Sequence, residues 1–452
     1  MTRVLAHYVS VETAALGVFE LALSFLIIDV LLNAFGGIEV LGASSAVVAG
    51  DATALAALLA LTTAGIAATI GLYRPEICLE RRRTLVAALT AGIVAFPVLL
   101  LVSNGYQIRL TAPVMVKLAG LLIVCQTGIL LTHLAFAAVV PRGGMVRRVL
   151  VVGSGRRANR LMEMLRTRRG RLFVPVEAPT DGLPLTPAAL RGQKIWGVVL
   201  ASDDVAGQPP LTLLDSKLRG VRVLSDTAFC ELHLGRIDLD TIDANWMLCA
   251  DGFVHGRIAN ATKRALDLLV SMVLLVLTLP VMLATAMLIR LGSPGPVFYR
   301  QQRVGLHGEI FTLYKFRSMT VDAETGGKPR WAQQRDPRIT WIGSFVRPMR
   351  IDELPQLFNV LLGQMSVIGP RPERPHFVEQ LSHAIPFYQE RSYVKPGITG
   401  WAQVNYPYGA SVEDAREKLS YDLYYVKNRS LLIDLLILVS TVRVILLREG
   451  AR

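Results

Sequence analysis

Two adjacent acids, Asp352 and Glu353, open the apolar run DELPQLFNVLLG, which ends at Gly363. Its leucines and phenylalanine recur at helical spacing, and Pro355 fits a first helical turn, so an amphipathic helix should start near Asp352. A carboxylate there faces unpaired N–H groups and stays ionised, as a nucleophile or Mg²⁺ ligand requires. The same pair also begins many ordinary helices, and taken alone the two residues favour that interpretation.

Basic residues crowd the segments around these acids. Runs of charge are usually solvated surface, but here proline, glycine and aromatic residues that restrict loop geometry separate the cations. Arg371 lies between Pro370 and Pro372, which restrain its backbone. Guanidinium groups recognise phosphate oxygens bidentately, so acids beside arginines suit phosphoryl transfer. The cations are Lys315, Arg317, Arg338, Arg347, Arg350, Arg371 and Arg374.

The chain as a whole is hydrophobic and basic. Of its 452 residues, 52% are hydrophobic and 18% are charged, and the formal net charge is +13. This composition indicates membrane segments and anionic partners such as lipid headgroups or phosphorylated substrates. Nucleic acid is disfavoured, because the basic residues show neither zinc spacing nor aromatic stacking platforms. The 4 cysteines lack paired spacing and predict reduced thiols.

Four apolar stretches in the first third of the chain each approach the ~20 residues that span a bilayer. They are residues 13–35, 50–73, 84–103 and 112–140. Basic connections at 73–83 and 141–148 place both ends of this bundle in the cytoplasm. The first stretch is interpreted as a retained membrane helix, and we expect its acids, Glu20 and Asp29, to pair within the bundle or lie near an interface.

A strand–turn–helix pattern follows the bundle, with Gly153-Ser154-Gly155 at the turn. As a dinucleotide fingerprint the turn is weak, because Ala158 replaces the third glycine and neither Glu177 nor Asp181 clearly ends a second strand. Cofactor binding and a plain βα turn both remain open. Buried parallel strands are expected at 149–152, 197–202 and 221–226.

A second hydrophobic feature, residues 264–290, is long enough to span a bilayer but has basic residues at both ends. Pro280 removes a helix hydrogen bond near its middle. A helix–break–helix that enters and leaves one leaflet fits both facts. The alternative is a proline-kinked fifth span, which would put everything after residue 290 outside the cell.

Residues 263–447 resemble the monotopic phosphoglycosyl transferases, also called bacterial sugar transferases or polyprenyl-phosphate glycosylphosphotransferases. The matching stretches include YKFRSM, RIDELPQLFNVLLGQMSVIGPRP, KPGITGWAQVN and YDLYYVKNRSLLIDLLIL, in addition to the hydrophobic hairpin. The preceding spans and α/β segment resemble the long, exopolysaccharide-priming branch of that family.

The resemblance implies that Asp352 attacks the sugar-proximal phosphorus of a UDP-sugar, releases UMP and holds the sugar-phosphate for polyprenyl phosphate. It also implies Mg²⁺ with Asp352 as a ligand, Glu353 assisting the metal or the acceptor, and glucose or galactose as the sugar. Lys315, Arg347 and Arg371 match family positions near the phosphates. The expected phosphate-binding set is Lys315, Arg317, Arg347, Arg350 and Arg371.

The predicted fold is therefore an α-helical membrane bundle, an α/β Rossmann-like domain and a mainly α catalytic domain with a membrane re-entrant hairpin. The boundaries are 1–145 for the bundle, 146–240 for the α/β domain, 241–262 for a linker and 263–452 for the catalytic domain. We expect a bacterial cytoplasmic membrane protein whose catalytic domain faces the cytoplasm. The possibility of a homo-oligomer is left open.

Two other classes of function remain to be separated from this one. A membrane-bound sugar oxidoreductase or epimerase would use the Gly153 turn, but the chain lacks a credible Tyr-x-x-x-Lys pair, and a nicotinamide-binding assay would decide. A non-enzymatic membrane scaffold would leave the acids and arginines unexplained, and release of UMP from a UDP-sugar would exclude it.

Overall fold

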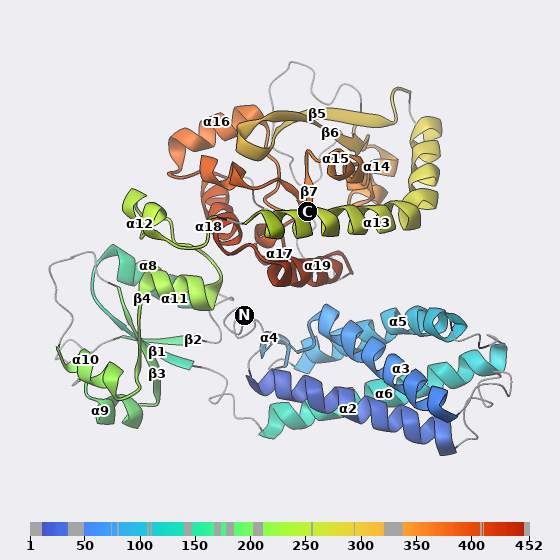
Figure 1. The fold of residues 1–452 in the computed structure, drawn as a ribbon, viewed down its shortest axis with the longest axis horizontal. Coiled ribbons are helices and arrows are strands. Elements are labelled where there is room, and N and C mark those ends of the chain that lie inside the picture. The colour runs from blue at the N-terminus through green and yellow to red at the C-terminus, as the bar shows by residue number, and fades with distance from the viewer. Residues whose placement is uncertain are drawn as a thin grey trace. The chain divides into compact units, whose positions relative to one another are not determined.

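The computed structural model divides the chain into two compact units, residues 1–234 and 235–452. The residues it describes are mainly helical, with one small parallel sheet and two short two-stranded sheets (Figure 1). The described residues are 11–34, 49–73, 75–78, 81–105, 108, 111–139, 147–166, 173–177, 185–201, 211–254, 256–292, 294–320, 338–406, 409 and 411–446.

Four long apolar helices open the first unit and confirm the four predicted stretches to within a few residues. Each is long and apolar enough to cross a membrane. Small side chains such as Ala56, Ala60 and Ala95 are fully buried among leucines, which lets the helices approach closely. The helices are α2 (Val11–Ala34), α3 (Ala49–Ile70), α5 (Arg81–Gly105) and α6 (Ala112–Val139), with the short α4 (Pro75–Cys78) between α3 and α5.

The acids of α2 differ in their surroundings. Glu20 is fully buried, and its Oε1 lies 2.8 Å from His133 Nδ1 and accepts a 2.5 Å hydrogen bond from Thr132 Oγ1. Because both partners belong to α6, the prediction that Glu20 pairs within the bundle is confirmed. Within the described part of the chain, the buried Oδ1 of Asp29 has no hydrogen-bond partner. The connection 140–146, which contains most of the predicted basic exit, lies outside the described residues.

A parallel sheet in the order β2-β1-β3-β4 follows the bundle. Strands β1, β3 and β4 confirm the three predicted apolar runs. The sequence missed β2 because it contains Pro175, which a sheet tolerates at an edge such as this one. Asp181 lies outside the described residues. The strands are β1 (Arg147–Val152), β2 (Phe173–Glu177), β3 (Ile195–Leu200) and β4 (Arg222–Ser225).

Helices cover both faces of this sheet, which explains why its central strands are apolar where they are buried. On one face, Val149 and Val151 pack against Leu161 of α8 and Phe229 of α11. On the other, Leu150 packs with Leu190 of α9 and with α10. These helices are α8 (Arg156–Arg166), α9 (Pro187–Gly192), α10 (Leu211–Leu218) and α11 (Asp226–Phe229), the last continued by the π-helical turn η3 (Cys230–Leu234).

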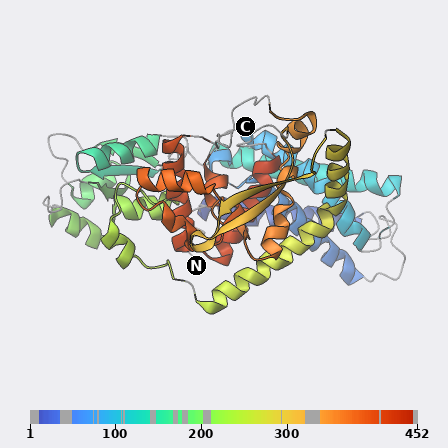
Figure 2. The same ribbon diagram turned by 90° about the horizontal axis from the view of Figure 1, so that it is seen from above.

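The second unit contains one very long helix, α13 (Arg257–Gly292), after the short α12 (Ala244–Cys249). The sequence predicted a break at Pro280, and this detail is wrong, because the helix continues through the proline. Instead α13 bends toward its C-terminal end, as both ribbon views show (Figures 1 and 2). A proline inside a helix favours such a bend because it removes one hydrogen bond and clashes with the preceding turn.

A β-hairpin and a set of short helices complete the second unit. The hairpin joins β5 (Phe298–Val304) to β6 (Ile310–Phe316), and a parallel pair joins β7 (Ser366–Ile368) to β8 (Gly397–Thr399). Met282 and Ile289 of α13 pack with Phe316 of β6 and with Ile342 and Val346 of α14. The helices are α14 (Trp341–Val346), α15 (Gln356–Leu361), α16 (Pro375–Ala384), α17 (Trp401–Asn405), α18 (Val412–Asn428) and α19 (Leu431–Leu446).

Candidate active site

Asp352 and Glu353 lie in a single 3₁₀ turn, η6 (Ile351–Glu353), and not at the start of the α-helix as the sequence predicted. The α-helix begins at Gln356, because Pro355 occupies its N-cap position, and it ends just before Gly363. Arg350 precedes the turn with a left-handed backbone, φ 57°. This conformation is uncommon for an arginine and redirects the chain so that both acids are buried.

Lys315 comes to the acids from the β5–β6 hairpin. Side chains alternate along a strand, and Phe311 and Leu313, which share the face of Lys315, are both buried. Asn359 of α15 fixes the helix to this strand: its Nδ2 donates to Thr312 O at 2.7 Å, and Tyr314 N donates to its Oδ1 at 3.1 Å. The position of α15 relative to β6 therefore sets the distance from Glu353 to Lys315.

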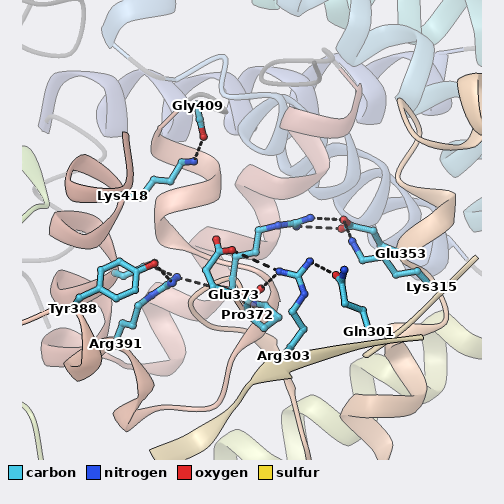
Figure 3. A network of polar contacts seen from close by, with 12 residues as sticks. Gln301, Arg303, Lys315, Glu353, Pro372, Glu373, Tyr388, Arg391, Gly409 and Lys418 are labelled. Atoms are coloured by element: carbon cyan, nitrogen blue, oxygen red, sulfur yellow. Dashed lines mark hydrogen bonds and ion pairs between the residues drawn. The ribbon is translucent and has the colours of Figure 1, made fainter. Parts of the chain in front are cut away.

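Glu353 is held by three cations, and Figure 3 shows Lys315 beside it. Its Oε1 lies 2.7 Å from Arg371 Nη2, 3.1 Å from Lys315 Nζ and 3.5 Å from Arg350 Nη1. Burial opposes ionisation of this carboxyl, yet Arg371, Lys315 and Arg350 together hold its pKa well below the usual range. Glu353 is therefore a fixed negative charge that forms ion pairs with three basic side chains.

Asp352 has the opposite environment, although it is the adjacent residue. Burial, and then the charge of Glu353, raises the pKa of Asp352 to about 6, against the opposing effect of Lys315, Arg347 and Arg350. Its Oδ1 is buried and accepts no hydrogen bond from the described part of the chain. A buried carboxylate oxygen without a donor is costly, so this atom has the properties of a group that reacts with or binds a ligand.

The other predicted cations occupy different positions. Arg347 and Arg350 lie close enough for their charges to lower the pKa of Asp352. Arg317 is buried, and its Nη1 donates to the Pro294 carbonyl at 2.7 Å, so at least part of this guanidinium is used to hold the backbone. Arg338 forms a backbone hydrogen bond with Thr320. Arg374 is the N-cap residue of α16.

Four residues that sequence reasoning did not single out support the site. Asn359 aligns α15 with β6, as described above. Arg303 and Arg391 donate to the backbone of the Arg371 loop, at Pro372 O and Arg371 O respectively. Arg264 of α13 donates to Val360 O at 2.6 Å and Leu361 O at 2.9 Å, which caps the C-terminus of α15. No motif marks these roles, because each depends on a contact between segments far apart in the sequence.

The described residues contain no group of three or more His, Cys, Asp or Glu side chains that could hold a metal ion. A hard cation that keeps several waters and bridges substrate phosphates needs only one or two protein carboxylates, and Mg²⁺ is usually bound in this way. The buried Oδ1 of Asp352, which has no hydrogen-bond donor in the described structure, fits such a ligand. Glu353 is already paired with three cations.

Comparisons with known proteins identify the type of catalytic unit. The family described as bacterial sugar transferase matches residues 258–448. The UDP-N-acetylgalactosamine-undecaprenyl-phosphate N-acetylgalactosaminephosphotransferase of Aeromonas hydrophila is 44% identical over 253 residues, 56% of this chain and 59% of that protein. The sugar transferase EpsL of Bacillus subtilis, whose function is uncharacterised, is 43% identical over 192 residues, 42% of this chain and 89% of EpsL.

A third relative is the UDP-glucose:undecaprenyl-phosphate glucose-1-phosphate transferase of Xanthomonas campestris. It is 45% identical over 181 residues, which are 40% of this chain and 37% of that protein. The chain thus aligns with 59% and 37% of the lengths of the Aeromonas and Xanthomonas relatives. The alignment to EpsL, in contrast, covers most of that shorter protein.

Proposed function

The chain belongs to the bacterial sugar transferase family, and we propose that it transfers a sugar-1-phosphate from a UDP-sugar to undecaprenyl phosphate. The activities after which two relatives are named support this reaction, since both act on undecaprenyl phosphate. The observation that supports it best is the buried Oδ1 of Asp352, which has no hydrogen-bond donor in the described structure and lies next to a carboxylate that gathers three cations. The product would prime exopolysaccharide or related glycan assembly.

In the first step, a carboxylate oxygen of Asp352 attacks the sugar-proximal phosphorus of the donor. A new bond forms between this oxygen and phosphorus, and the bond from phosphorus to the bridging oxygen of the diphosphate breaks. UMP leaves with the electron pair, and because it is a phosphate of low basicity it needs no strong general acid. The sugar-phosphate remains on Asp352 as an acyl phosphate, which conserves its potential for transfer.

In the second step, a phosphate oxygen of undecaprenyl phosphate attacks the same phosphorus, and the carboxylate of Asp352 leaves. Polyprenyl-diphosphate-sugar is formed and the enzyme returns to its initial state. Three cations surround Glu353, namely Lys315, Arg350 and Arg371, so this region carries more positive than negative charge. Such fixed cations stabilise the charge that develops on phosphate oxygens in the transition state.

The family resemblance implies Mg²⁺, and Asp352 is the residue that would hold it. When bound, the ion would neutralise negative charge on the diphosphate and orient it. We propose that Glu353 acts by holding Lys315 and Arg371 in place, because its Oε1 is 3.1 Å and 2.7 Å from their nitrogens.

The sugar is proposed from the relatives alone. The activities after which they are named concern glucose and N-acetylgalactosamine, so UDP-glucose and UDP-N-acetylgalactosamine are the first donors to test. Galactose, which the family resemblance suggested beside glucose, is the third.

We further propose that α13 enters and leaves one leaflet, so that the catalytic domain stays in the cytoplasm with its soluble donor. The bend in the C-terminal part of α13 (Figure 2), a helix that contains Pro280, and the basic residues at both ends of the apolar segment support this arrangement. The strand order β2-β1-β3-β4, with helices on both faces, supports a doubly wound α/β interpretation of the sheet domain, in the flavodoxin-like order and not the classical Rossmann order.

The decisive test uses the purified full chain in nanodiscs with undecaprenyl phosphate, Mg²⁺ and each of the three donors. UMP release and a radiolabelled sugar-phosphate on the protein are measured. We expect Asp352→Asn to lose both signals and Glu353→Gln to be severely impaired, while thermal unfolding shows that both variants remain folded. Near-normal turnover by Asp352→Asn would show that another group is the nucleophile.

A further inference from the structure

The loop that presents Arg371 to Glu353 has an unusual backbone. Two of its residues, Pro370 and Pro372, lack an N–H group, so the loop can form few of the hydrogen bonds that stabilise regular structure. One side of the loop also borders a cavity of about 380 Å³, which is lined by Pro370, Arg371, Pro372, Tyr388 and Arg391 among others. Tight packing therefore holds this loop less completely than a buried strand.

Four consecutive carbonyl groups of the loop nevertheless each accept a hydrogen bond. Backbone amides supply the two outer donors: Gly397 N donates to Pro370 O at 2.9 Å, and Val304 N donates to Glu373 O at 2.9 Å. Arginine side chains supply the two inner donors. Arg391 Nη2 donates to Arg371 O at 2.9 Å, and Arg303 Nη1 donates to Pro372 O at 2.8 Å.

Arg391 is itself fixed from two directions. Its Nη2 also donates to Asp422 Oδ2 of α18 at 2.7 Å, and its Nη1 donates to the Tyr388 hydroxyl at 2.9 Å (Figure 3). The side chains of Arg391 and Asp422 are 12% and 3% exposed, so solvent screens this ion pair little. A guanidinium held in this way has little freedom to release the Arg371 carbonyl.

Arg303 is held in a similar manner on the other side of the loop. Its Nη2 donates to Gln301 Oε1 at 2.5 Å, and its Nη1 lies 3.6 Å from Glu373 Oε2. The two arginines come from different elements, β5 and the 3₁₀ segment η7 (Gln389–Tyr393). Together they attach the centre of the loop to the hairpin and to α18.

We propose that Arg391 and Arg303 are positioning residues, which hold the Pro370–Glu373 backbone so that the Arg371 guanidinium reaches Glu353 and the donor phosphates. The contact of Arg371 with the donor phosphates rests on the proposed function, but the positioning of the loop does not. Arg371 Nη2 lies 2.7 Å from Glu353 Oε1, a distance that a small shift of the loop would lose. Displacements of about 1 Å at such sites can cost about 100-fold in rate.

The first test is a double-mutant cycle with UMP release as the readout. Arg391→Met should lower kcat/KM about 10- to 100-fold, as losses of supporting residues commonly do. Arg391→Lys, which keeps a charge for Asp422 and one donor for the loop, should recover part of this loss. In an Arg371→Met background, Arg391→Met should cause little further loss, because the residue that it positions is already absent. Equal losses in both backgrounds would overturn the proposal.

A matched control separates positioning from general destabilisation. Arg236 also forms a buried ion pair with α18, where its Nη1 lies 2.7 Å from Glu417 Oε2. Arg236→Met should lower the melting temperature, as Arg391→Met does, but leave kcat/KM of the folded protein unchanged. If Arg236→Met reduced kcat/KM as much as Arg391→Met, the effect of Arg391 would be structural only.

Hydrogen exchange tests the same idea without any turnover and so remains valid if the proposed reaction is wrong. The amides of Gly369, Arg371, Glu373 and Arg374 should exchange faster in Arg391→Met and Arg303→Met than in the wild-type chain, and Arg236→Met should leave them unchanged. Unaltered exchange in both loop variants would overturn the positioning role. Faster exchange in a protein that releases no UMP from any donor would support the positioning role and reject the proposed function.

Discussion

Two buried clusters of charge in the second unit use similar residues in different ways. The first is the active-site cluster of Asp352, Glu353 and their cations. The second, which we call the anchor network, consists of Lys263, Asp267, Ser366, Tyr425 and Asp434. Lys263 Nζ lies 3.0 Å from Asp267 Oδ1 and 3.2 Å from Asp434 Oδ2. Ser366 Oγ donates to Asp267 at 2.9 Å, and the Tyr425 hydroxyl donates to Asp434 at 2.8 Å.

The clusters differ in the balance of their charges. The anchor network has two acids for one lysine, and Ser366 and Tyr425 donate to these acids. Its Asp434 Oδ2 lies 3.2 Å from Lys263 Nζ but accepts no hydrogen bond in the described structure. The active-site cluster has more cations than acids, and one oxygen of Asp352 has no hydrogen-bond donor in the described structure. This difference teaches that the sign of the charge excess separates the two clusters, since only the active-site cluster has the excess of cations that the phosphates of the proposed donor would balance.

The largest effect on stability is expected from the anchor network. Lys263→Met leaves Asp267 and Asp434 buried without their cation, and breaking such a pair typically costs about 3–5 kcal/mol. Thermal unfolding in nanodiscs should show this loss, while UMP release per folded molecule stays within about twofold of wild type.

A second substitution controls for this prediction. Adding Asp434→Leu to Lys263→Met removes one of the stranded acids and should recover part of the stability. A large loss of turnover in the folded Lys263→Met protein would break the distinction between the two clusters.

The next effect concerns the contact that aligns the active-site cluster. Asn359→Leu removes three hydrogen bonds, to Thr312, Tyr314 and Gln364, and leaves buried partners unpaired. We expect a loss of about 1–3 kcal/mol in unfolding free energy, together with a larger fall in kcat/KM than Lys263→Met causes. Gln364→Ala, which removes only the exposed partner, is the control and should have a small effect on both measurements.

The sequence identified residues that the structure brings together, but it did not predict their local geometry. The spacing of apolar residues indicated α15, and Asp352, Glu353 and Arg371 were identified from residue type. The sequence misplaced the helix start, because the left-handed Arg350 and the 3₁₀ turn after it do not change the apolar pattern. It also predicted that a carboxylate there would stay ionised, whereas burial and the charge of Glu353 raise the pKa of Asp352, and only Glu353, with Arg371, Lys315 and Arg350 beside it, has a pKa well below the usual range.

The fold was predictable where one physical demand dominated the sequence. Long apolar stretches required helices α2, α3, α5 and α6, and continuous apolar runs required strands β1, β3 and β4. The sequence predicted the bend that Pro280 favours, but not that α13 would continue through it, because packing of its C-terminal half decides whether a proline kinks or ends a helix. Contacts such as Arg391 with the Arg371 carbonyl depend on tertiary structure and leave no local signal.

A smaller effect on stability is expected from a change of pH, and it depends on Asp434 of the anchor network. Burial raises the pKa of Asp434 above its ordinary value of 3.8, even though Lys263 and Tyr425 face it. A group with a raised folded-state pKa contributes stability below its unfolded pKa and loses it as pH rises through the folded pKa. The melting temperature of wild type relative to Asp434→Asn should therefore fall as pH rises from the ordinary pKa of 3.8 through the raised pKa of the folded state.

Asp414 is a control of opposite sign. Hydrogen bonds from Ser411 lower the pKa of this exposed capping carboxylate, so its contribution is lost as pH falls. The melting temperature of wild type relative to Asp414→Asn should thus rise with pH over the acidic range. Parallel slopes for the two variants would show that burial of Asp434 is not the cause.

The smallest effect is expected from substitution of Pro280, which divides α13 into two halves, one beside each cluster. The half of the helix before it contains Lys263 and Asp267, and the half after it packs Met282 and Ile289 on the core beneath the active-site cluster. Pro280→Leu restores a helix hydrogen bond and removes a clash, together about 3 kcal/mol in favour of a straight helix. Contacts at both ends resist straightening, so we expect a mixed population and a partial loss of activity.

Cysteine labelling beyond Arg290 measures this population directly. The wild-type catalytic domain should be labelled only from the cytoplasmic side, and a fraction of the Pro280→Leu protein should be labelled from outside, with activity reduced in proportion. Val281→Leu, a change at a neighbouring position that is 45% exposed, keeps the proline and should behave as wild type. Labelling of the wild type from outside would contradict re-entry, because the Asp352 site would then lie on the opposite side of the membrane from a cytoplasmic UDP-sugar.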